Sequence, residues 1–351
     1  MPSVWNRCAF TVAKRDYLWR DVMLAAMWRG AWAPFEARLR HGLACEAHSY
    51  ESDDPADQDV VDAATAAFRY ANELITAEET ERWLERMGLS IETWSAYFAR
   101  QDLLARWGND LDAIMDAHAP DDDLVREHLV AEGICSGRFR EMGVALAGLA
   151  AVAAGREDAG GVLVSQPGPA ALQALRTSHG FLLEDIPDDD LGERLAGVAR
   201  LEAVFAATRD AAITHDALQA QIESSRLDWM VVDMERLSFP EESMVRETLL
   251  CCREDGLTLG QLAQRIRRRV HTEELRLEDS PPDLRPLLLS APPGELLGPI
   301  AADDAFHAIV VRGKRLPSAD DPEVRQLAER AVVDAVLHRA RVLHVHWQNW
   351  V

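Results

Sequence analysis

Apolar positions in the first part of the chain recur at the spacing of amphipathic helices. Residues 59–71 place their apolar side chains on one face. Thr76 and Glu79 have the spacing of a capping box, and Gly88 ends the helix that they begin. We therefore expect residues 1–110 to form a helical N-terminal region.

The centre of the chain resumes this helical pattern after an interruption. Residues 110–123 are acidic and include Pro120, which predicts a solvated linker. Helical periodicity returns at residue 124 and continues, with breaks, to residue 226. Residues 111–226 are therefore expected to form a helical middle region.

The pattern changes in residues 227–317, where short apolar runs alternate with helical segments. The expected order is a strand at 229–237, a helix from Pro240 to Gly256, a shorter helix at 257–266, a strand at 270–277, a helical turn through Leu289, a turn at 292–294 and a final strand at 306–311. Because each connection is short, we expect one small α+β domain whose strands share one sheet.

Charge and cysteine content exclude some classes of function. The 351 residues include 59 acidic and 37 basic side chains, giving a formal net charge of −22, which disfavours nucleic-acid binding. The five cysteines are scattered without Cys-x-x-Cys spacing, and no secretion signal or membrane-length apolar run is present. We therefore expect a cytoplasmic protein with reduced thiols that does not bind membranes.

Two motifs in the α+β segment resemble a known family. Pro293-Gly294-Glu295 with Gly298-Pro299-Ile300, followed by the strand at 305–311, resembles the end of a parvulin domain. Residues 254–263 are similar to the short-helix segment of the same domain. Parvulins are peptidyl-prolyl isomerases that occur in SurA-type and PpiC-type foldases. The helical start of the chain is similar to the N-terminal portion of these foldases.

The resemblance has consequences for the whole chain. It implies that residues 227–317 form a parvulin-like domain and that residues 318–351 form a terminal helix packed back on the helical body. The predicted fold class is therefore α+β, with a mainly helical N-terminal body, a small C-terminal parvulin-like domain and a terminal helix.

The departures from the parvulin pattern concern its histidines. Parvulins place a histidine on the first strand, where this chain has Met234, and no histidine occurs between Leu227 and Gly256. The Gly-Gly-x-Leu-Gly stretch is also missing from residues 267–283. His307 alone keeps its place, so the resemblance implies a parvulin fold that has lost part of its isomerase apparatus.

The candidate site residues follow from this resemblance. His307 is the candidate catalytic residue, and the alternative is a histidine at the edge of the core that hydrogen-bonds a backbone carbonyl. For peptide binding, the candidates are Met234 and Phe306 in an apolar pocket, Leu262 on the short helix, and the basic residues Arg267 and Arg268, which either anchor an acidic peptide or form a solvated face.

Two other chemistries have candidate residues in the sequence. Cys135 has the chemistry of a nucleophile, but the sequence identifies no base beside it, so a buried structural thiol is favoured. His338, His344 and His346 lie near the C-terminus without the cysteine or carboxylate spacing of a metal site, so a terminal strand or a frayed helix end is favoured over metal binding. We expect neither a metal nor a cofactor.

The preferred hypothesis is a cytosolic, chaperone-like accessory protein that binds a peptide or an unfolded protein segment. Its role would be to assist maturation of a ribosomally made peptide, alongside a biosynthetic partner enzyme. The alternative is an active peptidyl-prolyl isomerase that uses His307. Whether the protein is an enzyme therefore stays open at this point. A third hypothesis is a peptide-modifying enzyme that uses Cys135.

Overall fold

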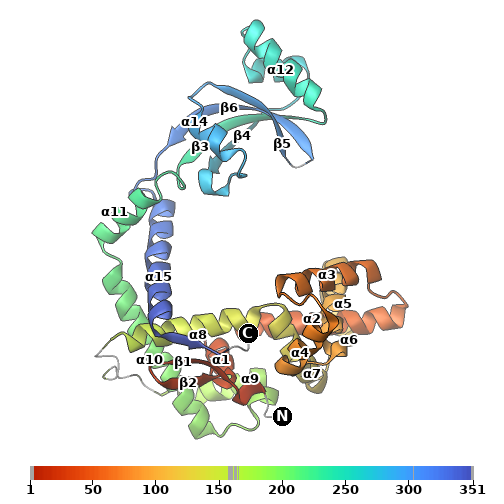
Figure 1. Ribbon diagram of the computed structural model, residues 1–351, viewed down its shortest axis with the longest axis vertical. Helices are drawn as coiled ribbons and strands as arrows, with labels where there is room; N and C mark the ends of the chain where they lie inside the picture. Colours follow the sequence, from red (N-terminus) through yellow and green to blue (C-terminus); the bar gives the residue numbers. More distant parts are fainter. Residues whose placement is uncertain (1–3, 157–160, 162–163, 165, 303, 349–351) are drawn as a thin grey trace. The chain divides into compact units, whose positions relative to one another are not determined.

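The computed structural model describes residues 4–156, 161, 164, 166–302 and 304–348, and it divides the chain into two compact units (Figure 1). Unit 1 comprises Met1–Arg209 and Val336–Val351, and unit 2 comprises Asp210–Ala335. Unit 1 is mainly helical, and unit 2 contains a four-stranded sheet. The structure thus confirms the predicted α+β class with a helical N-terminal body, a small sheet-containing domain and a terminal helix.

Unit 1 is built mostly from helices that begin and end at clear local signals. Thr76 caps one of them by accepting a hydrogen bond from the amide of Glu79, and Gly88 ends it in the left-handed conformation. The helices are α1 (Trp19–Trp28), α2 (Trp32–Ser52), α3 (Gln58–Ala71), α4 (Ala77–Met87), α5 (Ile91–Arg106), α6 (Leu111–His118), α7 (Asp122–Cys135), α8 (Arg138–Ala154), α9 (Pro169–Leu183) and α10 (Asp188–Ala212), the last of which continues into unit 2.

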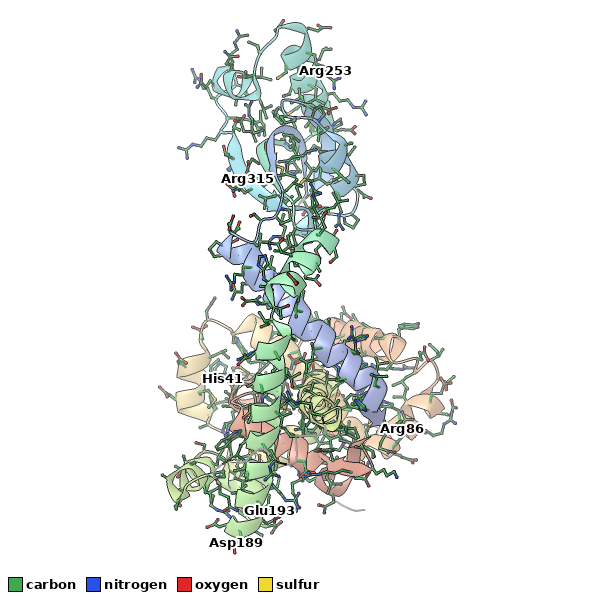
Figure 2. All side chains as sticks on the ribbon, turned by 90° about the vertical axis from the view of Figure 1, so that its left-hand side faces the viewer. His41, Arg86, Asp189, Glu193, Arg253 and Arg315 are labelled. Atoms are coloured by element: carbon green, nitrogen blue, oxygen red, sulfur yellow. The ribbon has the colours of Figure 1, made fainter. Side chains whose placement is uncertain are left out.

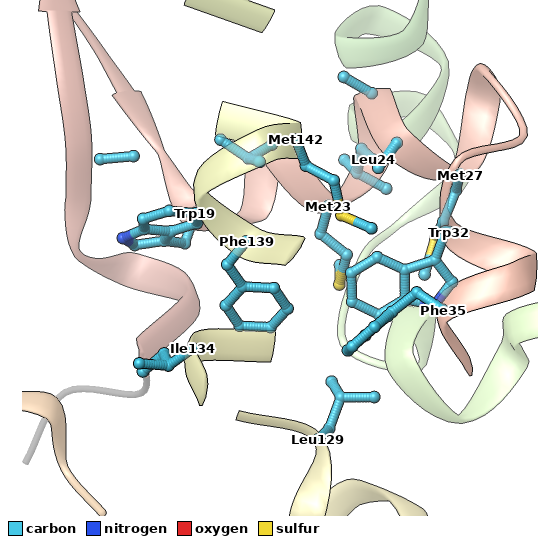
Figure 3. Packing of buried hydrophobic residues seen from close by; sticks show 14 of the residues in the cluster. Trp19, Met23, Leu24, Met27, Trp32, Phe35, Leu129, Ile134, Phe139 and Met142 are labelled. Carbon is cyan, nitrogen blue, oxygen red and sulfur yellow. The ribbon is translucent and has the colours of Figure 1, made fainter. Parts of the chain in front are cut away.

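Phe139, at the start of α8, lies at the centre of the unit 1 core (Figure 3). Its ring centroid is 5.7 Å from those of Trp19 and Phe35 and 6.1 Å from that of Trp32. Gly133 on α7 allows this packing, because a Cβ at that position would lie 2.2 Å from the Phe139 ring. The aromatic cluster therefore fixes α1, α2, α7 and α8 against one another.

A small sheet joins the two ends of unit 1 and corrects the expectation that residues 1–110 are only helical. Strands β1 (Cys8–Val12) and β2 (Arg15–Leu18) form an antiparallel hairpin, and β7 (Val345–Trp347) pairs with the other edge of β1. The hairpin turn consists of Ala13 and Lys14, both with positive φ. Residues of this type give no turn signal in a sequence.

The acidic segment 110–123 is also not the linker that its composition predicted. It contains α6 and the beginning of α7. Ile114 is buried in a cluster with Ala44 and Cys45 of α2, so apolar packing of one face outweighs the high charge of the other.

Unit 2 contains a four-stranded antiparallel sheet with strand order β4-β3-β6-β5 (Figure 1). Its elements are α11 (His215–Ser224), β3 (Val231–Phe239), α12 (Glu242–Glu254), α13 (Leu259–Arg265), β4 (His271–Arg276), the 3₁₀ turn η3 (Leu277–Asp279), α14 (Arg285–Ser290), β5 (Leu296–Ala302) and β6 (Ala305–Arg315). Helix α15 (Pro322–His344) follows and continues into the C-terminal part of unit 1. The expected order is found, with β5 as an additional strand that follows the turn expected at 292–294.

The sheet of unit 2 has a core on each face. Met234 of β3 and Ile309 of β6 belong to the core that α14 covers through Leu288. Phe239 of β3 belongs to the core on the opposite face, which α12 and α13 cover. The alternation of side chains along each strand accounts for this division.

A helix that spans a bilayer needs about 20 predominantly apolar residues, and the helices of the described residues can be judged by that length and composition. None of them is both long enough and apolar enough to cross a membrane.

Candidate functional site

His307 lies on β6, directly opposite Ser238 of β3, and is 4% exposed. Its Nε2 is 2.9 Å from the carbonyl oxygen of Ala302, and its Nδ1 is 2.9 Å from the hydroxyl of Ser238. Because a carbonyl only accepts hydrogen bonds, Nε2 carries a proton and donates the hydrogen bond. In the neutral ring Nδ1 then accepts a hydrogen bond from Ser238, so both nitrogens are occupied within the sheet.

The backbone around His307 is equally confined. Gly298 on β5 has φ of +137°, and a Cβ there would lie 2.7 Å from the His307 carbonyl oxygen. Only glycine permits so close an approach of the two strands. The Gly298-Pro299 motif that carries part of the parvulin resemblance thus has a structural role beside His307.

Met234 and Phe306 do not share a pocket. Met234 is buried on the face covered by α14, whereas Phe306 packs on the opposite face with Phe239. His307 alternates with Phe306 along β6 and so lies on the same face as Met234. Met234 nevertheless sits four positions from Ser238 on β3, roughly 13 Å along a strand that rises about 3.3 Å per residue.

The remaining predicted binding residues lie on or beside α13. Leu262 is buried, and Arg267 is exposed with a positive φ of 56°. Arg268 donates a hydrogen bond to the carbonyl oxygen of Ser238 at 2.7 Å and lies over the Phe239 ring at 4.9 Å. The structure therefore brings Arg268 and His307 to the same residue, Ser238, and leaves Arg267 apart from them.

Unit 2 has a cavity of about 470 Å³ on the face covered by α12 and α13. It is lined by Leu259, Leu296 and Val310, and Arg253 and Glu295 stand at its rim. Since His307 lies on the other face, this cavity does not place a ligand against the histidine.

The structure also describes the surroundings of the cysteine candidate. Burial, with a smaller contribution from the charge of Glu132, raises the pKa of the Cys135 thiol to about 12. The thiol is therefore protonated at neutral pH and unsuited to nucleophilic attack. Within the described parts of the chain, no three His, Cys, Asp or Glu side chains lie close enough together to hold a metal ion.

Unit 1 has a groove of about 1400 Å³. We call it the unit 1 groove. Leu24 of α1, Leu146 of α8, Leu172 of α9, and Val198 and Leu201 of α10 form its apolar floor. Strand β2 and the first turns of α10 contribute charged residues at its rim. The sequence gives no signal for this groove, because β2 and α1 are far in the chain from α8, α9 and α10, and these five lining elements share no motif.

Ion pairs hold the elements around the groove together. Arg194 of α10 contacts Asp21 of α1 at 2.7 Å and Asp190 at 2.9 Å. Arg176 of α9 pairs with Asp188 at 2.6 Å. Burial would lower the pKa of Arg194, but its two carboxylate partners outweigh this effect and raise it. The charge pairs thus fix α9 and α10 as walls of a preformed site.

A buried network positions α9. His179 interrupts the helix with φ of −137°, and its Nδ1–H donates a hydrogen bond to Glu36 of α2 at 2.8 Å. Glu36 also accepts hydrogen bonds from Trp32 and Arg40. Burial alone would raise the pKa of Glu36, but the hydrogen bonds from His179 and Arg40 lower it below its usual 4.5. The ionised carboxylate of Glu36 therefore holds α9, one wall of the groove, at the point where His179 interrupts the helix.

Comparisons with known proteins show a distant structural likeness and no matching family. No protein-family model matches the chain, and no curated protein matches it. One similar solved structure is described as that of the virulence factor PEB4 and the periplasmic protein Cj1289, two structurally related SurA-like chaperones of Campylobacter jejuni. The likeness covers 69% of this chain and 94% of the other, at 11% identity and a TM-score of 0.19, which does not establish a common fold.

Proposed function

We propose that this protein is a chaperone-like accessory protein that holds an extended polypeptide segment in the unit 1 groove. The observation that carries the proposal is the groove itself. Its volume of about 1400 Å³ exceeds the roughly 300–1,000 Å³ of small-molecule pockets. An apolar floor with a charged rim suits a peptide, which presents apolar side chains together with polar backbone and charged groups.

We further propose that residues 227–317 form a parvulin-like domain that supports binding without isomerising its client. The amide barrier of about 18–20 kcal/mol requires an isomerase to hold the X-Pro bond twisted in an apolar pocket, and Met234 and Phe306 lie on opposite faces of the sheet. His307 has both nitrogens engaged by Ala302 and Ser238. The apolar Met234 takes the place of the second histidine, so an active isomerase has less support.

A finer proposal concerns the client and its setting. The parvulin resemblance and the scattered cysteines of the sequence support a cytoplasmic protein that presents a ribosomally made peptide to a partner enzyme. The client would then be bound during its maturation and released to that enzyme.

The groove can be blocked without disturbing the fold. Gly197 of α10 lines the groove, and a Cβ there would meet no atom within 4 Å. A tryptophan at this position therefore projects into open space, and loss of a helix-interior glycine favours the helix by up to about 1 kcal/mol. Gly180 of α9 has equally open surroundings but does not line the groove, so Gly180→Trp is a matched control.

The proposed function is tested by the aggregation of a denatured protein. Citrate synthase is diluted from guanidinium chloride, and light scattering is followed with and without the full-length protein. We expect wild type and Gly180→Trp to suppress scattering and Gly197→Trp to do so much less. Equal scattering with and without the wild-type protein would count against a chaperone-like function.

A further inference from the structure

The charges along the unit 1 groove are unequal. Six carboxylates line it, against four guanidinium groups, among the residues that the structure describes. Asp21 and Asp190 form ion pairs with Arg194, and Asp188 forms one with Arg176, so these three carboxylates share two guanidinium groups. Asp16 accepts a hydrogen bond from Thr11 at 2.7 Å. The two carboxylates that remain are those of Asp189 and Glu193.

Asp189 and Glu193 are exposed and four residues apart, which places them on one face of α10. Figure 2 shows both at the same end of this helix. No hydrogen bond or ion pair joins either side chain to another described residue. A carboxylate in the first turn, such as Asp189, is favoured by the helix dipole. Glu193 lies in the second turn, where that effect has faded, so helix stability does not explain it.

The two guanidinium groups not used in ion pairs lie elsewhere. Arg15 of β2 lies over the Tyr17 ring at 4.9 Å. Arg200 follows Glu193 by seven residues, roughly 10 Å along a helix that rises about 1.5 Å per residue. The end of the groove at the start of α10 therefore keeps an unbalanced negative charge.

We propose, on the basis of the peptide-binding function above, that the groove selects extended segments in which an arginine or lysine is flanked by apolar residues. The basic head group binds between Asp189 and Glu193. The flanking side chains lie on the floor formed by Leu172, Val198 and Leu201. An arginine suits this site because its planar fork donates several hydrogen bonds to carboxylates while its stem packs on apolar surface.

The test uses two fluorescein-labelled peptides of about nine residues, long enough to span roughly 30 Å when extended. Both contain Leu, Val, Ser and Gly, and they differ only in a central Arg or Gln. Their dissociation constants are measured by fluorescence anisotropy at low salt, where charge contacts are least screened. The proteins are wild type, the double variant Asp189→Asn/Glu193→Gln, and the control Glu81→Gln/Glu85→Gln on α4, which has the same spacing, exposure and change in charge.

We expect wild type and the α4 control to bind the Arg peptide about tenfold more tightly than the Gln peptide. In the Asp189→Asn/Glu193→Gln variant this preference should fall to within about twofold. If both peptides bind and the preference is absent from wild type or unchanged in that variant, the proposed selectivity is overturned while peptide binding stands. Failure of both peptides to bind wild type would overturn peptide binding and the selectivity together.

Discussion

The contact between Gly133 and Phe139 gives a prediction whose magnitude can be worked out from the structure. Phe139 is 2% exposed and is surrounded by Trp5, Trp19, Trp32 and Phe35. Its replacement by alanine should lower the free energy of unfolding of unit 1 by about 3–5 kcal/mol. The same helix carries Leu146 of the groove floor, so this core also supports the proposed binding site.

Gly133→Ala tests the same contact from the other side. The new methyl would lie 2.2–2.5 Å from three atoms of the Phe139 ring, so the ring must move. Overpacking of this kind costs about 1–3 kcal/mol, against a gain of up to about 1 kcal/mol from replacing a helical glycine. In a Phe139→Ala background the obstacle is gone, and Gly133→Ala should become neutral or stabilising.

Urea unfolding followed by tryptophan fluorescence measures these effects. Of the ten tryptophans only Trp229 lies in unit 2, so the signal reports almost entirely on unit 1. We expect the double variant Gly133→Ala/Phe139→Ala to be more stable than the sum of the single effects predicts, by about 1–3 kcal/mol. Strict additivity would refute the claim that the Phe139 ring is what Gly133 accommodates.

Three further predictions concern single side chains. Glu36→Gln should lower the free energy of unfolding by about 1–3 kcal/mol. Because the pKa of Glu36 in the folded protein lies below 4.5, this difference from wild type should persist above that pH and disappear as the pH falls through the folded pKa. Urea titrations at a series of acidic pH values measure it. In a protease-coupled X-Pro isomerisation assay, both wild type and His307→Ala should leave the reaction at its uncatalysed rate. Acceleration by wild type that is lost in His307→Ala would instead establish the isomerase alternative. Cys135, whose thiol pKa is about 12, should react with iodoacetamide at neutral pH far more slowly than a free cysteine, and rapid labelling of it in intact protein would contradict its burial.

Local signals in the sequence predicted the helices well. The capping box at Thr76 and the helix end at Gly88 occur as expected, because caps satisfy backbone groups through neighbouring residues alone. The strands β3, β4 and β6 of unit 2 were also found from their apolar runs, whereas β5, which follows the turn expected at 292–294 and contains Gly298 and Pro299, was not expected.

Elements that depend on distant partners were not predictable in this way. The sequence left open a terminal strand or a frayed helix end near His346, and only the pairing with β1, at the other end of the chain, shows the three-residue strand β7. The hairpin of β1 and β2 turns at Ala13 and Lys14, which are not turn formers by type. Helix α6 is acidic, and only its contact with α2 shows why it folds.

The same distinction applies to the candidate sites. The sequence placed His307 on a strand and left open whether it is catalytic or hydrogen-bonds a backbone carbonyl at the edge of the core. Its bonds to Ser238 and Ala302 depend on strand pairing, which the sequence does not contain. The unit 1 groove depends on the packing of β2, α1, α8, α9 and α10, so no single stretch of sequence could indicate it.

The central claim is that the unit 1 groove binds polypeptide. Its most direct test is an anisotropy titration of the Arg-containing peptide with wild type, Gly197→Trp and Gly180→Trp, after circular dichroism has shown equal helix content. Occupation of the groove by the Gly197→Trp side chain should weaken binding about tenfold or more, a loss of roughly 1.4 kcal/mol, while Gly180→Trp binds as wild type does. Equal affinities for all three proteins would place peptide binding outside this groove and contradict the account.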